Sequence, residues 1–288
     1  METTELLKKV RKIEIKSRGL SRNIFAGQYH SAFKGRGMAF SEVREYQFGD
    51  DVRDIDWNVT ARHNKPYIKV FEEERELTVM LLIDVSASRN FGAVGGSKKE
   101  MMTEIAATLA FSTIQNNDKI GVIFFSNKIE KFIPPQKGRK HVLYIIRELI
   151  EFNPENRETN ISLALEYVTN VIKKRCTIFM MSDFIDTNNY QKALTIANNR
   201  HDLVALQIYD KREKELPNIG LIKLKDAERG GEMWIDTASR QVRETYAQWW
   251  LKNQQKMRDV AVRSGVDITS IATDEDYVRS LITLFERR

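Results

Sequence analysis

The sequence predicts an α/β protein with a doubly wound, mostly parallel sheet and a small β-rich accessory unit. From Leu77 onward, near-continuous apolar segments of strand length alternate with longer segments of helical periodicity. The apolar segments carry few polar residues, which is typical of parallel strands covered by helices on both faces. Before Leu77, glycines, aromatic residues and charges are mixed, and this pattern indicates turns and short strands.

Composition favours a soluble, cytoplasmic protein. The 288 residues are 42% hydrophobic, enough for a sizeable core at this length. The longest apolar runs, LTVMLLI and IGVIFF, fall short of the roughly 18 residues that a transmembrane helix needs, so no membrane span is expected. METTELLKKVRK has no apolar signal-peptide core. The single Cys176 excludes an internal disulfide, and its place at the start of an apolar run predicts a buried, inert thiol.

The net charge of +6 resides in the first 36 residues, which hold nine Lys and Arg and three Glu. A basic segment of this kind is compatible with an acidic partner, which could be a protein, a nucleic acid or a lipid surface. A solvated, positively charged helix face is the simpler interpretation. Residues 5–16 support it, because their apolar residues follow helical spacing and predict an amphipathic helix.

The accessory segment, residues 1–76, is expected to contain this helix followed by short strands at 38–40, 57–59 and 67–71. Trp57 is expected to anchor a small core. Residues 211–238 contain two strand-like runs around a Gly-Gly pair, which predicts a β-hairpin. We expect this hairpin to pack with the accessory segment.

The core, residues 77–210, is expected to alternate strands and helices, and residues 239–288 to complete it. Strands are predicted at 77–84, 119–126, 128–134, 176–183 and 202–210. Helices are predicted at 98–115, 139–152, 160–175 and 190–200, with Asn160 as the N-cap of the third. The last part is expected to be a long helix over 239–263, a strand over 266–274 and a final helix.

Hydroxyl and carboxylate side chains follow two of the apolar strands where these strands end. Asp84, Ser86 and Ser88 come after the first strand, and Asp183 comes after Ser182 at the end of another. Thr159 precedes a predicted helix. Because ligands bind at the carboxyl ends of strands in open α/β sheets, these side chains could converge on one edge.

This set offers oxygen ligands only. Such ligands suit Mg²⁺, with Mn²⁺ or Ca²⁺ as alternatives. Too few protein ligands are present to complete an octahedron, so water or a partner's carboxylate would fill it. The alternative is that each residue hydrogen-bonds its own turn and no metal binds.

Asp-x-Ser-x-Ser, a distant Thr and a later Asp together resemble the metal-ion-dependent adhesion site of von Willebrand factor type A domains. Longer blocks resemble the bacterial family called domain of unknown function fifty-eight, over nearly the whole chain. These blocks are GMAFSEVREYQFGDDVRDIDWNVTAR, HNKPYIKVFEEERE, LLIDVSAS, MMSDF and VDITSIATDEDYVRSLITLFERR.

The resemblance implies a von Willebrand factor A-like fold in a cytosolic or membrane-attached protein. Such proteins often work beside a MoxR-type AAA+ ATPase, in chaperone or assembly processes. In sites of this type, Asp84 and Asp183 would reach the metal through water. Ser86, Ser88 and Thr159 would coordinate it directly, and an acidic side chain of a protein partner would complete the shell. Ser162 stands close to Thr159 in sequence and is the alternative for that position.

A metal-dependent phosphoesterase or nuclease is the alternative function. The acidic cluster Asp50, Asp51, Asp54 and Asp56 could hold a metal, and the basic segment could hold nucleic acid. Arginines interspersed in this cluster favour ion pairing instead.

Other catalytic patterns fit less well. A dehalogenase-type phosphatase needs Asp-x-Asp, and Ser86 occupies the second position. GAVGGSKKE lacks the spacing of a phosphate-binding loop. The four histidines are dispersed, and no Cys/His or Ser/His/Asp set is evident. We therefore expect a non-enzymatic, metal-dependent protein-binding module, and nucleic acid is not the expected partner.

Overall fold

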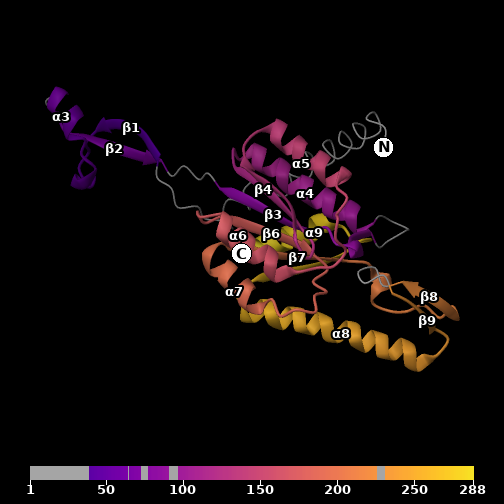
Figure 1. Ribbon diagram of the computed structural model, residues 1–288. Helices are drawn as coiled ribbons and strands as arrows, with labels where there is room; N and C mark the ends of the chain where they lie inside the picture. The colour runs from indigo at the N-terminus through magenta and orange to yellow at the C-terminus, as the bar shows by residue number, and fades with distance from the viewer. Residues whose placement is uncertain (1–38, 64, 73–76, 91–96, 226–230) are drawn as a thin grey trace. The chain divides into compact units, whose positions relative to one another are not determined.

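The structure is a computed structural model that describes residues 39–63, 65–72, 77–90, 97–225 and 231–288 (Figure 1). Two compact units are distinguished, a small one within Lys34–Leu77 and a large one that contains Thr78–Arg288. The amphipathic helix predicted at residues 5–16 lies outside the described residues.

The large unit is built on a six-stranded sheet with the strand order β10-β7-β6-β3-β4-β5. Neighbouring strands are parallel, except that β5 is antiparallel to β4. The predicted doubly wound, mostly parallel α/β class is therefore confirmed. The strands are β3 (Thr78–Asp84), β4 (Lys119–Phe125), β5 (Ile129–Gln136), β6 (Thr177–Ser182), β7 (Asp202–Tyr209) and β10 (Asp267–Ala272).

Helices cover both faces of this sheet, with α4 and α5 on one side and α6, α7 and α8 on the other (Figure 1). They are α4 (Lys98–Gln115), α5 (Arg139–Glu151), α6 (Ile161–Val171), α7 (Gln191–Arg200), α8 (Arg240–Arg263) and α9 (Tyr277–Glu286). Asn160 caps α6 as predicted, since its side chain accepts a hydrogen bond from the Leu163 nitrogen at 3.0 Å.

Successive side chains of each central strand belong to different cores, because side chains alternate across a strand. Met180 of β6 packs in a cluster with Leu165 of α6 and Leu194 of α7. The preceding residue, Phe179, meets Phe285 of α9, with ring centroids 6.2 Å apart. Burial on both faces explains why these strands are apolar throughout.

The small unit is an antiparallel hairpin of β1 (Ala39–Glu45) and β2 (Tyr67–Glu72), with the 3-10 helix η1 (Val52–Asp54) and α3 (Trp57–His63) between them. The strand predicted at 57–59 is wrong, because the Asp56 carboxylate accepts from the Asn58 and Val59 nitrogens and starts a helix. Trp57 is 68% exposed, so the structure does not support its expected role as a core anchor.

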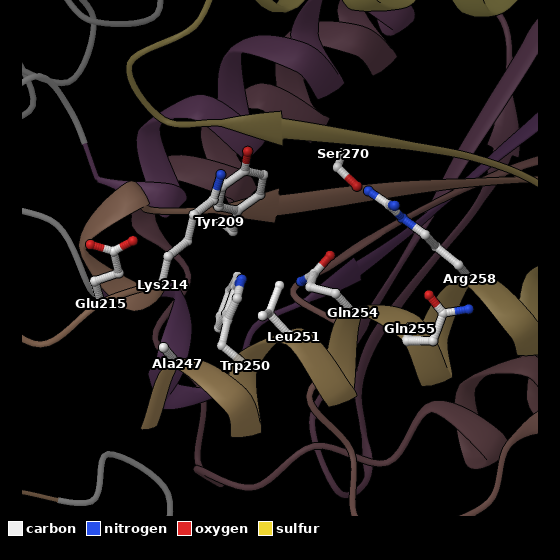
Figure 2. A pocket seen from close by; sticks show the side chains of 10 residues that line it. All are labelled: Tyr209, Lys214, Glu215, Ala247, Trp250, Leu251, Gln254, Gln255, Arg258 and Ser270. Atoms are coloured by element: carbon white, nitrogen blue, oxygen red, sulfur yellow. The ribbon is translucent and has the colours of Figure 1, made fainter. Parts of the chain in front are cut away.

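The predicted second hairpin consists of β8 (Leu221–Lys225) and β9 (Glu232–Asp236), which pair antiparallel. Its packing against the accessory segment stays a prediction. Two further 3-10 helices, η2 (Ala87–Asn90) and η3 (Lys211–Glu213), follow β3 and β7. Side chains of α8 and of the β7–β10 edge border a cavity of about 310 Å³ (Figure 2).

Gly121 of β4 is required by close packing of the sheet. A Cβ atom there would lie 2.8 Å from the Ile133 carbonyl oxygen and 2.9 Å from the Pro135 nitrogen, both backbone atoms of β5. We expect Gly121→Ala to lower the free energy of unfolding by about 1–3 kcal/mol, measured by urea denaturation. Gly231→Ala is the matched control, because nothing lies within 4 Å of its added Cβ. Equal effects of the two substitutions would contradict this account.

Candidate metal centre

The candidate centre lies where the winding of the sheet reverses direction. β3 has β4 on one side and β6 on the other, so the connections that leave β3 and β6 diverge at their carboxyl ends. Ligands in open α/β sheets bind at such switch points. Ile83 and Met181 are register partners, so the next residues, Asp84 and Ser182, reach the same edge.

Asp84 is the buried centre of this group, with an exposure of 2%. Its Oδ1 accepts a hydrogen bond from the Ser86 nitrogen at 2.9 Å. Its Oδ2 accepts from the Ser182 hydroxyl at 2.6 Å and, at the long distance of 3.5 Å, from the Thr159 hydroxyl. Within the described residues, no basic side chain forms an ion pair with Asp84.

The hydroxyl groups predicted as ligands gather around this carboxylate. The Oγ atoms of Ser86 and Ser88 are 3.1 Å apart. The Ala87 nitrogen donates to the Arg157 carbonyl oxygen at 3.0 Å, and this bond ties the serine loop to the segment that carries Thr159. Ser162 lies inside α6, and the described structure shows no hydrogen bond from its hydroxyl to this group. Geometry thus favours Thr159 for the fifth position.

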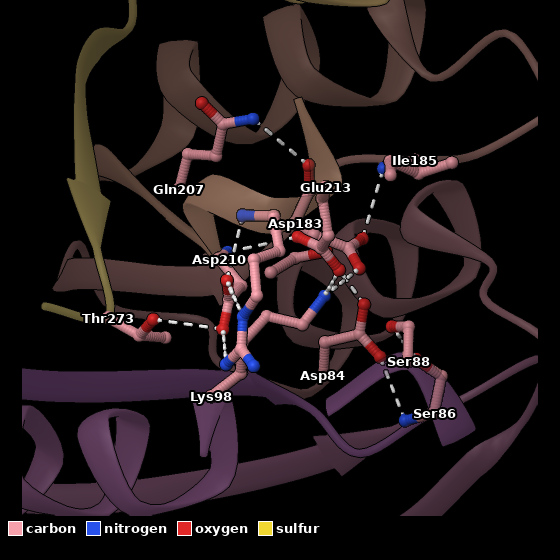
Figure 3. A network of polar contacts seen from close by, with 12 residues as sticks. Asp84, Ser86, Ser88, Lys98, Asp183, Ile185, Gln207, Asp210, Glu213 and Thr273 are labelled. Carbon is pink, nitrogen blue, oxygen red and sulfur yellow. Dashed lines mark hydrogen bonds and ion pairs between the residues drawn. The ribbon is translucent and has the colours of Figure 1, made fainter. Parts of the chain in front are cut away.

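Asp183 is held by a buried cation that the sequence analysis missed. Lys98, at the start of α4, is 0% exposed and its Nζ lies 3.0 Å from Asp183 Oδ2 and 2.6 Å from Glu213 Oε1 (Figure 3). The other oxygen of Asp183 accepts from the Ile185 nitrogen at 3.1 Å. Gln207 of β7 donates to the Asp183 carbonyl oxygen at 3.2 Å. All five predicted residues are therefore brought together, with Lys98 and Glu213 added to them.

A weak signal for Lys98 exists in the sequence. A lysine in the first turn of a helix faces the positive end of the helix dipole, which is unfavourable unless acidic groups compensate it. Ser97 and Glu100 form a capping box that identifies this turn as the helix start. Nothing in the sequence shows that Asp183 and Glu213 approach it, because they follow two other strands, β6 and β7.

The charges of the centre make Asp84 the more readily protonated of its two aspartates. Burial, and then repulsion from Asp183, raise the pKa of Asp84 to about 6. Burial also acts to raise the pKa of Asp183, but the charge and hydrogen bond of Lys98 outweigh it and hold that pKa below its usual value. Burial lowers the pKa of the nearby Arg89 to about 10, and the Asp84 charge opposes this shift.

The donor set fits a hard divalent cation. Asp84 is a buried carboxylate with hydroxyl and amide donors around it and no cation of its own, so its charge is poorly compensated. Oxygen ligands of this kind suit Mg²⁺ or Mn²⁺. Among the described residues, no three His, Cys, Asp or Glu side chains form a metal-binding group. A cation here would depend on two carboxylates, hydroxyl groups and water.

The acidic cluster of the small unit is engaged in structural contacts. Arg44 forms two hydrogen bonds with the Asp50 carboxylate, at 2.8 and 2.9 Å. Asp51 caps η1 and Asp56 caps α3. Ion pairing, the interpretation favoured from the sequence, is therefore found for Asp50, and these contacts favour a structural role over a nuclease site.

A Cys/His pair that sequence analysis did not find is present at the opposite end of β6. The Cys176 sulfur lies 3.3 Å from His201 Nδ1. Burial raises the pKa of the Cys176 thiol to about 12, and burial together with nearby arginines lowers the pKa of His201 to about 4. The prediction of a buried thiol is confirmed. The raised pKa supports the prediction that it is inert, because a thiol that stays protonated is a poor nucleophile.

Comparisons with known proteins agree with this fold. A family model described as "Protein of unknown function DUF58" matches residues 42–256, about three quarters of the chain. An uncharacterized protein of Mycobacterium tuberculosis is 26% identical over 292 residues, covering 100% of this chain and 91% of its own length.

Solved structures of similar fold include an aerotolerance-related membrane protein of Bacteroides fragilis that carries multiple mutations to serines. Its TM-score is 0.51 at 14% identity, covering 74% of this chain and 100% of that one. A VWA domain gives a TM-score of 0.41 at 11% identity, covering 74% and 95%. The von Willebrand factor A-like fold expected from the sequence is confirmed. No helix in the described ranges is long and apolar enough to cross a bilayer.

Removal of the Lys98 ammonium tests the buried ion pairs. We expect Lys98→Met to lower the free energy of unfolding by about 3–5 kcal/mol, because Asp183 and Glu213 would remain buried without a counter-charge. Lys128→Met is the control: it breaks the exposed pair Lys128–Glu155, which water screens, so the unfolding midpoint should hardly change. Similar midpoints for both variants in urea would contradict the role of Lys98.

Replacement of Asp84 tests whether its ionised carboxylate lowers the free energy of unfolding of the metal-free protein. The folded chain holds this proton more tightly than the unfolded chain, where the pKa is about 3.9, so ionisation destabilises the fold as pH rises from about 4 to about 6. We expect metal-free Asp84→Asn to exceed the wild type in stability at about pH 7 by on the order of 1–3 kcal/mol. The gain should vanish below about pH 4.

Asp183→Asn is the matched control for this experiment. It should destabilise the protein, since the low pKa of Asp183 means that its ionised form stabilises the fold above the unfolded pKa. Thermal unfolding in the presence of a chelator measures both variants. A destabilised Asp84→Asn protein would show that Asp84 is a structural turn residue.

Proposed function

This chain belongs to the family of proteins of unknown function designated DUF58, and from that premise we propose that it is a non-enzymatic protein-binding module. The module would present a divalent cation at the carboxyl edge of its sheet. The observation that carries this proposal is the buried Asp84 carboxylate, which is surrounded by hydroxyl groups and has no ion-pair partner in the described structure.

The residues of the centre would share the work of holding Mg²⁺, with Mn²⁺ or Ca²⁺ as alternatives. Ser86, Ser88 and Thr159 offer neutral hydroxyl oxygens for direct coordination, while Asp84 and Asp183 would act through water. Ser182 and the Ser86 nitrogen orient the Asp84 carboxylate. When bound, the cation would supply one open position that accepts an oxygen of a partner's carboxylate.

The balance of charge supports an acidic partner. The carboxylates of Asp84, Asp183 and Glu213, when ionised, exceed the positive charges of Lys98 and Arg89 by one. A divalent cation would turn this into a net positive charge of one, and a single carboxylate would neutralise it. Because Lys98 already compensates Asp183, the cation would keep more of its attraction for an incoming acid.

The class of partner rests on the family resemblance seen in the sequence. We propose that the acidic side chain comes from a MoxR-type AAA+ ATPase or from its client, in chaperone or assembly work in the cytoplasm. A metal-dependent phosphoesterase or nuclease is the weaker alternative, because Asp50, Asp51 and Asp56 are engaged in ion pairing and capping.

Calorimetric titration of Mg²⁺ and Mn²⁺ tests the cation site. We expect saturable binding that is lost in Asp84→Ala and weakened in Thr159→Ala. Ser162→Ala is the matched control, because it removes a nearby hydroxyl that does not join the group. Absence of binding in the wild type, or equal binding by Asp84→Ala, would overturn the site. Phosphatase or nuclease activity that survives Asp84→Ala would favour the enzymatic alternative.

A further inference from the structure

The cavity beside α8 shares no residue with the candidate metal centre. Its aromatic base is formed by Tyr209 of β7 and Trp250 of α8, whose ring centroids are 6.0 Å apart. Leu251, one residue further along α8, borders it and is 66% exposed. Figure 2 shows Trp250, Leu251 and Gln254 between the two ends of the cavity. An apolar floor with an open apolar rim is suited to a large hydrophobic group.

The two ends of the cavity differ in charge. Lys214 and Glu215 lie at one end, and their charges balance (Figure 2). The Lys214 ammonium lies 4.6 Å from the centre of the Tyr209 ring. Arg258 lies at the other end beside Ser270, and it has no ion-pair or hydrogen-bond partner among the described residues. An anionic group on a ligand would therefore be attracted to the Arg258 end.

Helix α8 extends this basic and apolar character beyond the cavity. It carries six basic residues and two acidic ones, and one of the acidic residues, Glu244, is paired with Arg240. Exposed apolar side chains continue along the helix at Trp249 and Val262. The hairpin that directly precedes α8 exposes Met233 and Trp234.

We propose that this cavity, bordered by Tyr209, Trp250, Leu251 and Arg258 and from here on called the groove, binds an acidic protein segment. The segment inserts one large apolar side chain against the Tyr209–Trp250 base and places a carboxylate toward Arg258. A volume of about 310 Å³ is at the small end of ligand pockets, so it accommodates a single side chain. A concave site of this size favours a peptide over the flat surface of a bilayer.

The probe for this proposal is a short fluorescent peptide with one Phe flanked by Glu and Asp, titrated into the full chain in the presence of a chelator. We expect saturable binding by fluorescence anisotropy, weakened about tenfold when Phe is replaced by Ser. Leu251→Glu should weaken binding by a similar factor, because it removes an apolar contact and repels the acidic segment. Leu251 is exposed, so the fold should be retained, and circular dichroism checks this.

Two control variants make the test specific. Lys256→Ala removes the same charge as Arg258→Ala from an exposed position of α8 that does not border the cavity, so it should weaken binding much less. Asp84→Ala should leave peptide binding unchanged, since the groove does not use the cation. This result separates the groove from the proposed metal function.

Four outcomes would overturn the proposal. Absence of saturable binding would exclude a peptide site. Equal effects of Lys256→Ala and Arg258→Ala would reduce the binding to general attraction between opposite charges. Loss of binding in Asp84→Ala, with the fold retained by circular dichroism, would show that the peptide contacts the residues around Asp84 and not the groove. If anionic lipid vesicles bound in a way that depends on Leu251 and the peptide did not bind, the surface would be a membrane contact and not a peptide site.

Discussion

The ion pairs of Lys98 are the interaction on which the candidate site depends. One buried ammonium joins the start of α4, the end of β6 and the 3-10 helix that follows β7. Without it, two carboxylates at the switch point of the sheet would repel each other in a region with little water. With it, Asp183 stays ionised and oriented, while Asp84 keeps a raised pKa.

The site contains several local features that are unfavourable for the stability of the fold. Asp84 is buried without a cation, Lys98 stands at the unfavourable end of a helix dipole, and Phe184 adopts a positive φ of 58°. Strained or electrostatically costly features of this kind gather at functional positions. Their coincidence at one edge of the sheet supports a binding role more strongly than the presence of serines and aspartates does.

Hydrogen bonds connect the two proposed binding surfaces. Gln207 donates to the Asp183 carbonyl oxygen at 3.2 Å, and its own carbonyl accepts from the Ser270 hydroxyl at 2.8 Å. Ser270 borders the groove beside α8. Both proposals involve acidic groups, one through a bound cation and the other through Arg258. One acidic partner with two contact points would therefore satisfy the chemistry of both.

The sequence by itself determined the fold class and predicted five residues that meet at one edge of the sheet, because strand periodicity, helix caps and the Asp-x-Ser-x-Ser spacing are local properties. The cap of Asn160 was predictable for the same reason. Local pattern was insufficient at Trp57, where capping by Asp56 outweighed strand propensity. Tertiary structure alone decided that β6 lies beside β3 and that Glu213 returns to Lys98, because pairing between distant segments depends on the packing of the whole sheet and leaves no local periodicity in the chain.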